Sequence, residues 1–504
     1  MSRFPATLRV FCLAGVAYAI SAQVWAHAVS LAPHYVYLAY SLLQRRVDLI
    51  QLPPTTYDLL HLNGRWFVAG SPLPALMMLP FAAIFGVGFS DVLFSVILGA
   101  IDVALVYALL GIFVESAGQH SEQGPGGAQP QSATPHPSTL GEPSLRSGPL
   151  SAQDAPNPII ISESARRWIT LLFALGTPFW HLAALGTYWF TAHLVVVFFA
   201  LLATREALTR QRWFLAGLWL ACAGFARPTA LFLAPFFLII IFCSPLVTRH
   251  SSRMAYSAVR SMVLFGAALA IGIGAHFAYN YARFKSFTDF GYAYVTGADN
   301  ITSVYARYGG FNPRFAPCNL AVSLLAPPEV NGAVPAFITQ PCAYLLENVN
   351  LSDASALITP NPLGMSIFFV TPALLIIFAP LGASLKRRLF SAPSSFDSPS
   401  PPSPPVWRAA SEMRLTGRAP LVLAAWLGLL ATLIPLWLYH NTGSLQFGWR
   451  YLFDAAPLWI ILLAAGMPKV TRLKQGLILV SIAINWWGLA WMFEKLNGLS
   501  WWNF

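Results

Sequence analysis

Long apolar runs recur along most of this chain, and they restrict what it can fold into more than any other feature. Each run has about 18 to 24 residues, enough to cross a hydrocarbon core of roughly 30 Å as a helix. Lipid offers no hydrogen-bond partners, so the backbone inside a bilayer must bond to itself, as a helix does. The sequence therefore predicts an all-α polytopic membrane protein with about eleven transmembrane helices.

The charge distribution supports this prediction and indicates an orientation. Charged side chains make up only 10% of the 504 residues, and the formal net charge is +11. The basic residues form short clusters beside the apolar runs and do not follow one face, so the positive-inside rule explains them better than nucleic-acid binding. The N-terminus and four later clusters are therefore expected on the cytoplasmic side: residues 205–212, 249–260, 386–388 and 469–474.

This orientation places three polar segments on the outer side: residues 34–74, 281–364 and 440–450. For the cytoplasmic clusters and the outer segments to alternate along the chain, residues 74–115 must cross the membrane once. We therefore expect residues 74–86 to form a juxtamembrane helix at the outer interface, and residues 92–114 to form the span. In the competing topology residues 74–86 also cross, and the next loop is exported.

The predicted boundaries divide the chain into seven parts. Two of them, 116–164 and 391–418, are rich in Pro and Ser with few large apolar residues, and we expect disorder there. The other five are 1–115 (first helix, outer catalytic loop and second span), 165–281 (core helices), 282–364 (large outer loop), 365–390 (one helix) and 419–504 (C-terminal helices).

The first outer loop is the best candidate for an active site. A carboxylate there could act as a general base towards an acceptor hydroxyl or amine, if its partners fix its orientation. The alternative is a solvated loop with a surface ion pair. The polar residues gathered in this loop are His34, Asp48, Tyr57, Asp58, His61 and Arg65.

Polar residues within or beside the spans form a second group, and such residues usually face the interior of a bundle. Arg227 stands between two apolar runs, where a guanidinium can bind a phosphate through two hydrogen bonds or pair at a kink caused by Pro228. Gln446 and Arg450, in the late outer hairpin, could hold a phosphate or a sugar. The remaining members of this group are Asp102, His181, His193 and His276.

Cys318 and Cys342 both lie in the large outer segment, where an oxidising compartment would allow a disulfide; the sequence leaves that pairing open. The chain contains no Walker motif, dinucleotide fingerprint, HExxH or paired CxxC. Nucleotide hydrolysis and structural zinc are therefore disfavoured, and no metal-binding residues are predicted.

Several short stretches together resemble one known family. They are Tyr57-Asp58, Asn63-Gly64-Arg65-Trp66, Ser71-Pro72-Leu73-Pro74, Ala226-Arg227-Pro228-Thr229 and Phe447-Gly448-Trp449-Arg450-Tyr451. The family they resemble is that of the GT-C membrane glycosyltransferases that use polyprenyl-phosphate sugars, in particular bacterial family 39-like proteins related to protein mannosyltransferases and aminoarabinose transferases. The resemblance implies a GT-C bundle with juxtamembrane helices in its first outer loop, in a bacterial plasma (inner) membrane. It implies a polyprenyl-phosphate sugar as donor and an acceptor on the outer side, without fixing the sugar, the acceptor or a divalent metal.

The chain departs from the family at one important position. The family typically has an acidic residue directly after the first helix, where this chain has Ala32-Pro33-His34. The base is then Asp58, Asp48 or His34, and we favour Asp58 because its stretch best matches the family. The resemblance further implies that Arg227, with Arg65 or Arg450, neutralises the leaving phosphate.

Two other functions stay open at this stage. A transporter or flippase of a lipid-linked substrate could use Asp102, His181, His193 and Arg227 as a polar path, although the paired halves typical of transporters are not evident in the sequence. A non-catalytic subunit could keep the fold without the base.

Overall fold

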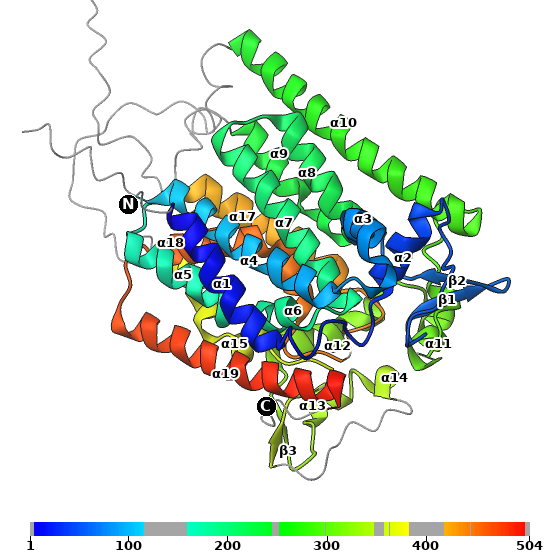
Figure 1. Cartoon of the computed structure of the whole chain (residues 1–504). Helices are drawn as coiled ribbons and strands as arrows, with labels where there is room; N and C mark the ends of the chain where they lie inside the picture. Colours follow the sequence, from blue (N-terminus) through cyan, green and yellow to red (C-terminus); the bar gives the residue numbers. More distant parts are fainter. Residues whose placement is uncertain are drawn as a thin grey trace, which may run out of the picture.

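The computed structural model describes residues 5–114, 159–243, 251–297, 299–346, 357–361, 363–382, 418–443 and 445–498. Most of the predicted disordered segments, 116–164 and 391–418, lie outside the described residues. The described part is mainly helical (Figure 1).

The helices up to the large outer segment are α1 (Ala6–Ala22), α2 (His34–Leu43), α3 (Leu73–Phe85), α4 (Asp91–Leu110), α5 (Glu163–Leu175), α6 (Phe179–Leu185), α7 (Tyr188–Thr209), α8 (Trp213–Ala226), α9 (Ala234–Phe242) and α10 (Ser251–Phe284). Those that follow are α11 (Asp299–Tyr308), α12 (Ala316–Leu320), α13 (Ala336–Thr339), α14 (Ala343–Leu346), α15 (Ile367–Val370), α17 (Arg418–Trp437), α18 (Ala456–Gly466) and α19 (Arg472–Asn497). The strands are β1 (Leu59–Leu62), β2 (Arg65–Val68), β3 (Glu329–Val330) and β4 (Ile358–Thr359), and three 3₁₀ helices matter below: η4 (Pro228–Leu233), η9 (Pro372–Phe378) and η11 (Arg450–Ala455).

Several helices are long and apolar enough to cross a membrane, which supports a multi-pass membrane protein. Within the described residues there are five, or six if α5 and α6, bent by 53°, form one span. The predicted count of about eleven is not confirmed, because other apolar runs form shorter helices. Two of these runs start as 3₁₀ helices at Pro228 and Pro372, because a proline, which lacks an N–H and whose ring meets the carbonyl four residues earlier, cannot continue the preceding helical turn. The five helices are Asp91–Phe113, Tyr188–Thr209, Tyr256–Phe284, Ala419–Trp437 and Arg472–Asn497.

The helix α3 is one of the shorter apolar helices, and it packs against α2 of the first outer loop. This agrees with the expected separate helix at residues 74–86. Whether it crosses the membrane stays a prediction.

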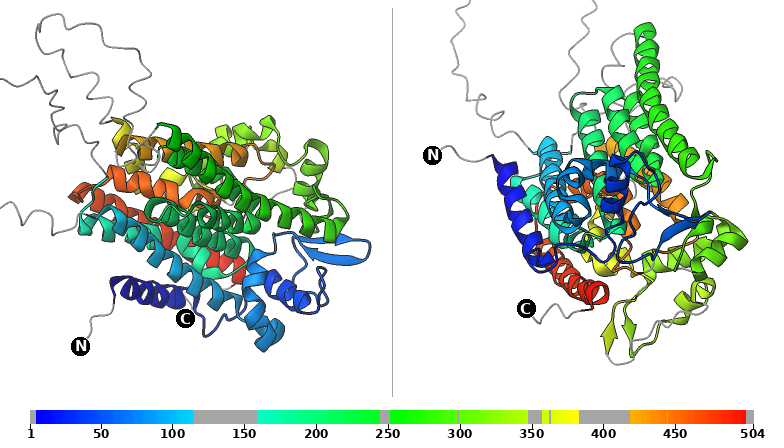
Figure 2. Two further views of the ribbon diagram at one scale, coloured as in Figure 1. Left: turned by 90° about the horizontal axis from the view of Figure 1, so that it is seen from above. Right: turned by 45° about the vertical axis from the view of Figure 1, so that its right-hand side comes forward.

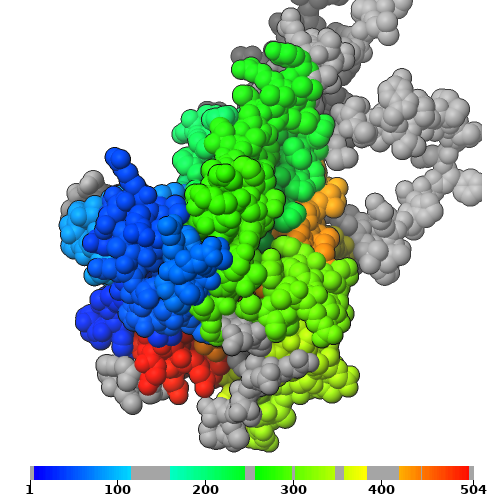
Figure 3. Space-filling model, turned by 90° about the vertical axis from the view of Figure 1, so that its right-hand side faces the viewer, coloured from blue at the N-terminus to red at the C-terminus, as the bar shows by residue number. Residues whose placement is uncertain are grey.

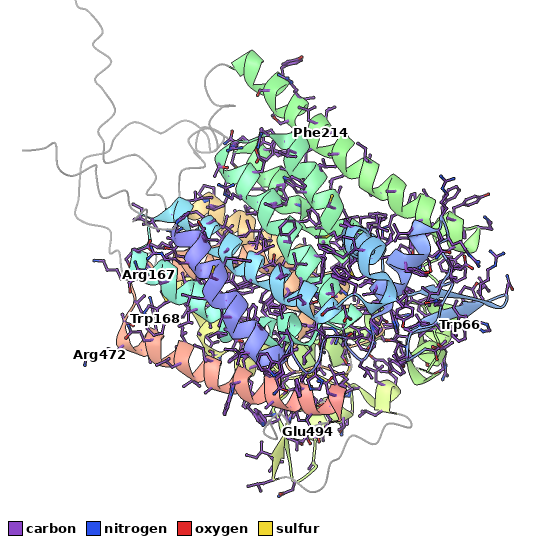
Figure 4. All side chains as sticks on the ribbon, viewed as in Figure 1. Trp66, Arg167, Trp168, Phe214, Arg472 and Glu494 are labelled. Carbon is purple, nitrogen blue, oxygen red and sulfur yellow. A yellow bond between two sulfur atoms is a disulfide. The ribbon has the colours of Figure 1, made fainter. Side chains whose placement is uncertain are left out.

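Residues from the predicted cytoplasmic side and from the first outer loop lie at opposite ends of the bundle. Figure 4 shows Arg167 and Arg472 at one end and Trp66, in β2, at the other. The helix α10 follows one edge of the bundle and α19 the opposite edge (Figures 1 and 2). The end that carries β1, β2 and α11 is therefore separate from the basic end, as a two-sided topology requires. The assignment of the basic end to the cytoplasm stays a prediction.

The two long segments predicted on the outer side fold mostly into short elements. The strands β1 and β2 pair antiparallel with Leu62 opposite Arg65. Asn63 and Gly64 form the two-residue turn between them with φ of +50° and +72°, values that Asn-Gly accepts readily. In the second of these segments Cys318 and Cys342 form a disulfide with Cα atoms 4.8 Å apart. The sequence alone had left this pairing open.

Glycine allows α8 and α10 to approach closely. A Cβ atom added at Gly217 of α8 would lie 2.6 Å from the Phe265 carbonyl oxygen of α10, and one added at Gly272 would lie 2.6 Å from the Ala221 side chain. Small residues at such contacts are the usual means of helix association in lipid, where van der Waals packing provides much of the attraction.

We predict that Gly217→Ala lowers the free energy of unfolding by about 1–3 kcal/mol, because the new methyl group meets a backbone atom that cannot rotate away. Thermal unfolding of the purified protein in detergent measures the change. Gly266→Ala is the matched control on α10, where an added Cβ meets no atom within 4 Å. Equal stability of the two variants would contradict the proposed close contact.

Candidate active site

A cavity of about 250 Å³ lies where the first outer loop meets the C-terminal end of α10 and the late hairpin. Figure 3 shows this side of the molecule, where the blue N-terminal region and the green region of α10 and α11 adjoin. The lining contains one carboxylate and three guanidinium groups, from Asp58, Arg227, Arg283 and Arg450. Six of the aromatic side chains beside them are Tyr35, Tyr57, Tyr188, Trp189, Tyr292 and Tyr451.

The backbone and two neighbouring segments hold Asp58 in place. Its φ is +60°, a left-handed conformation that Asp tolerates better than most residues, and its backbone N–H donates to the Thr296 carbonyl at 2.9 Å. The indole Nε1–H of Trp189, in α7, donates to Oδ2 at 2.7 Å. Burial raises the pKa of Asp58 above its usual value although these contacts favour the ionised form. The result is an oriented carboxylate with increased basicity at the cavity wall.

Asp48, the second predicted base, does not line the cavity. It is paired with Arg46, whose Nε lies 3.2 Å from Oδ1. The hydrogen bond from Arg46 lowers the pKa of Asp48. The structure therefore places Asp48 in a local ion pair, the alternative considered for this loop, and away from the candidate site.

His34, the third predicted base, also lies outside the cavity lining and supports the loop instead. Its Nε2–H donates to the Tyr57 carbonyl at 2.9 Å, and its ring lies 4.5 Å from the Tyr188 ring. Among the described residues its buried Nδ1 has no hydrogen-bond partner. Burial lowers the pKa of His34 from 6.5 to about 4, so the ring is neutral at pH 7.

The predicted substrate-binding residues divide into two groups. Tyr57, Arg227 and Arg450 line the cavity, whereas Arg65 is exposed at the hairpin turn and outside the lining. Gln446 is buried behind Arg450 and outside the lining.

Gln446 stabilises the backbone of the late hairpin. Its Oε1 accepts the Arg450 backbone N–H at 3.1 Å, and its Nε2 donates to the Thr442 carbonyl at 2.6 Å. The Arg450 side chain donates from Nη1 to the Gly443 carbonyl at 2.6 Å. The amide of Gln446 is thus used by the hairpin, and contact of Gln446 with a ligand stays a prediction.

The sequence analysis missed Asp454. This fully buried carboxylate lies in η11, and its Oδ1 is 3.0 Å from Arg227 Nε and 3.0 Å from His193 Nδ1. Asp454 stands four residues after Arg450 at the start of an apolar run, and an acidic residue in such a run is a sign of function that could have revealed it. The sequence analysis also missed Arg283, at the C-terminal end of α10, which does line the cavity.

Of the residues considered for a transporter path, Arg227 lines the cavity and the others lie elsewhere. Asp102, His181 and His193 do not line the cavity. Within the described residues neither carboxylate oxygen of buried Asp102 has a hydrogen-bond partner. His276 packs against Phe225 and Phe290. No group of three or more His, Cys, Asp or Glu side chains arranged for a metal ion is found in the part of the chain that the structure describes.

Comparisons with known proteins give one weak structural similarity. No family model and no curated protein matches the chain. The chain is similar to the crystal structure of the oligosaccharyltransferase of Archaeoglobus fulgidus in the apo form, with 13% identity and a TM-score of 0.45. The match covers 99% of this chain but only 56% of that chain, so this chain spans little more than half of its length. A similarity this weak does not identify the family or the activity of this chain.

We predict that His34 makes the protein less stable in mild acid. Its pKa is about 4 when folded and 6.5 otherwise, so between these values the unfolded state binds more protons and stability falls as the pH decreases. The loss from this one residue at pH 5 is about 2 kcal/mol. His34→Gln should reduce the fall in unfolding temperature between pH 7 and pH 5.

His61→Gln is the control for this measurement, because His61 belongs to the same loop but is exposed on β1. It should leave the pH dependence of unfolding as in the wild type. An unchanged pH dependence in His34→Gln would show that the neutral buried imidazole is not responsible.

Proposed function

We propose that this chain is a membrane glycosyltransferase that moves a sugar from a polyprenyl-phosphate donor to an acceptor on the outer side of the membrane. The observation that carries the proposal is the cavity itself. It combines an oriented carboxylate, Asp58, with the guanidinium groups of Arg227 and Arg450 among aromatic rings. The resemblance of the sequence to GT-C enzymes favours the same function.

The reaction is a direct displacement with inversion at the anomeric carbon. The acceptor oxygen or nitrogen forms a bond to this carbon as the bond from the carbon to the phosphate oxygen breaks. The electron pair of the broken bond leaves with the polyprenyl phosphate. Asp58 takes the proton from the acceptor, and its raised pKa makes it a better base than an exposed aspartate.

The arginines suit the leaving group. As the carbon–oxygen bond breaks, negative charge accumulates on the phosphate, and preoriented donors in a site with little water stabilise such charge strongly. Arg227 comes from the end of α8 and Arg450 from the start of η11, and both reach the same cavity. A planar guanidinium can bind two phosphate oxygens at once.

The size and the aromatic lining of the cavity suit a single sugar unit. Ligand pockets for drug-sized molecules are roughly 300–1,000 Å³, so a cavity of about 250 Å³ is closer to a monosaccharide than to an oligosaccharide. Tyr57, Tyr188 and Trp189 line the wall around Asp58 and offer flat apolar faces beside polar edges. The polyprenyl chain would remain in the lipid between helices.

The test is transfer of a labelled sugar from a polyprenyl-phosphate donor in proteoliposomes. We predict that Asp58→Asn lowers the rate by about 10²–10⁴-fold, because the amide keeps the shape but cannot accept the proton. Asp48→Asn is the matched control, and it should retain nearly full activity because Asp48 is paired with Arg46 outside the cavity.

The other outcomes are informative as well. Loss in Asp48→Asn with full activity in Asp58→Asn would reverse the assignment of the base. Full activity in both variants would remove both carboxylates from the mechanism. Absence of transfer by the folded wild type with each polyprenyl-phosphate sugar supplied would reject the proposed function.

A further inference from the structure

A buried polar cluster lies directly behind Arg227, and its central carboxylate is outside the cavity lining. Its centre is Asp454, which is 0% exposed, whereas the Arg227 side chain is 21% exposed and lines the cavity. We propose that Asp454 is a positioning residue, which holds the guanidinium of Arg227 towards the phosphate of the donor. This inference rests on the proposed function and adds a residue that does not itself touch the substrate.

Asp454 is held by groups from two other parts of the chain: His193 in α7, and Arg227 with Thr229 at the junction of α8 and η4. Its Oδ1 accepts from His193 Nδ1, in α7, at 3.0 Å and from Arg227 Nε at 3.0 Å. Its Oδ2 lies 3.2 Å from Arg227 Nε and also accepts from the Thr229 hydroxyl. Both oxygens are therefore satisfied, so the carboxylate is fixed and can in turn fix Arg227.

The hydrogen bonds of Arg227 leave its terminal nitrogens available to a ligand. Only Nε bonds to Asp454, and in the described part of the chain neither terminal nitrogen of Arg227 has a hydrogen-bond partner. The terminal nitrogens are the ones that bind two phosphate oxygens side by side. Asp454 thus uses the inner edge of the guanidinium and leaves its outer edge for the cavity.

Each of the other two arginines of the lining uses at least one terminal nitrogen for a hydrogen bond within the protein. Arg283 donates from Nη1 to the Val68 carbonyl and from Nη2 to Asn280 Oδ1, both at 2.9 Å. Arg450 donates from Nη1 to the Gly443 carbonyl at 2.6 Å. Arg227 is therefore the cavity arginine best prepared to bind a phosphate through two nitrogens.

Electrostatics and positioning predict different results when Asp454 is made neutral. Loss of the carboxylate makes the site more positive, so charge alone would strengthen the binding of a phosphate. If Asp454 positions Arg227, its loss should slow transfer even where binding is not weakened, because geometry matters most as charge develops on the leaving group. A fall in kcat without a rise in Kd distinguishes the two effects.

The experiment compares the wild type with Asp454→Asn, using the full-length protein. Transfer kinetics are measured in proteoliposomes, and binding of farnesyl phosphate is measured separately in detergent. We expect kcat to fall by about 10²-fold or more. We expect the Kd for farnesyl phosphate to stay equal or decrease. Wild-type kcat in a folded Asp454→Asn variant would overturn the proposal, and so would a rise in Kd that accounts for the lost activity.

A double-mutant cycle tests whether Asp454 acts through Arg227. Arg227→Lys removes the paired N–H donors of the guanidinium. Adding Asp454→Asn to it should cause little further loss of kcat if the two residues work as one unit. Losses that multiply in the double variant would overturn the proposal. Asp91→Asn is the matched control: Asp91 is also a buried carboxylate, bonded to the Ser30 backbone N–H at 2.9 Å, but outside the cavity lining.

A second variant keeps the test decisive if Asp454→Asn fails to fold. His193→Leu removes one donor to Asp454 and leaves every residue of the cavity lining in place. We expect about a tenfold lower kcat with unchanged Kd. Wild-type kcat in this variant would overturn the proposal.

Failure of the positioning role can be separated from failure of the proposed function. Farnesyl phosphate binding and transfer by the wild type, together with wild-type kcat in Asp454→Asn, would reject the role of Asp454 alone. A wild type that neither binds farnesyl phosphate nor transfers a sugar would reject both.

Discussion

The ion pair between Arg227 and Asp454 is the interaction on which the candidate site depends. A charge is costly away from water unless an opposite charge and hydrogen bonds compensate it. Here the carboxylate meets a guanidinium, an imidazole and a hydroxyl from two further parts of the chain. The ends of α8 and η11 can therefore meet beside α7 only in an arrangement that satisfies all of these groups.

The site is assembled from segments that are far apart in the sequence. Asp58 reaches the cavity because the first outer loop is bonded to residues after α10: the backbone of Asp58 donates to Thr296, and Thr296 donates back to Leu59 at 2.9 Å. Arg450 reaches it because Gln446 and Gly443 hold the late hairpin in its conformation. The first loop thus contributes a carboxylate held by backbone hydrogen bonds, and the late hairpin contributes a guanidinium held by hydrogen bonds between side chains and backbone.

Sequence patterns predicted local features better than distant contacts. Apolar length indicated membrane helices, and Asn63-Gly64 is a typical hairpin turn that the structure contains. Among the predicted residues Asp58, Tyr57, Arg227 and Arg450 lie together at the cavity, whereas Asp48, His34, Arg65 and Gln446 do not. Arg46 is only two residues from Asp48, so a local ion pair was one interpretation of this loop, but the sequence could not decide between that pair and a place in the site. The contact between Asp454 and His193 joins residues 261 positions apart, beyond the reach of any local pattern. The predicted number of spans is not confirmed, because some apolar runs are divided at prolines into shorter helices in the part of the chain that the structure describes.

The helix α7 carries two of the supporting contacts described above. Trp189, which bonds to Asp58, and His193, which bonds to Asp454, are four residues apart and so lie on the same face, separated by about 6 Å along the helix axis. One rigid turn of α7 therefore links the position of Asp58, the proposed base, to that of Asp454, the proposed support of Arg227. A sideways or axial shift of α7 would displace both donors together, so a change on one side of the proposed site would also affect the other side.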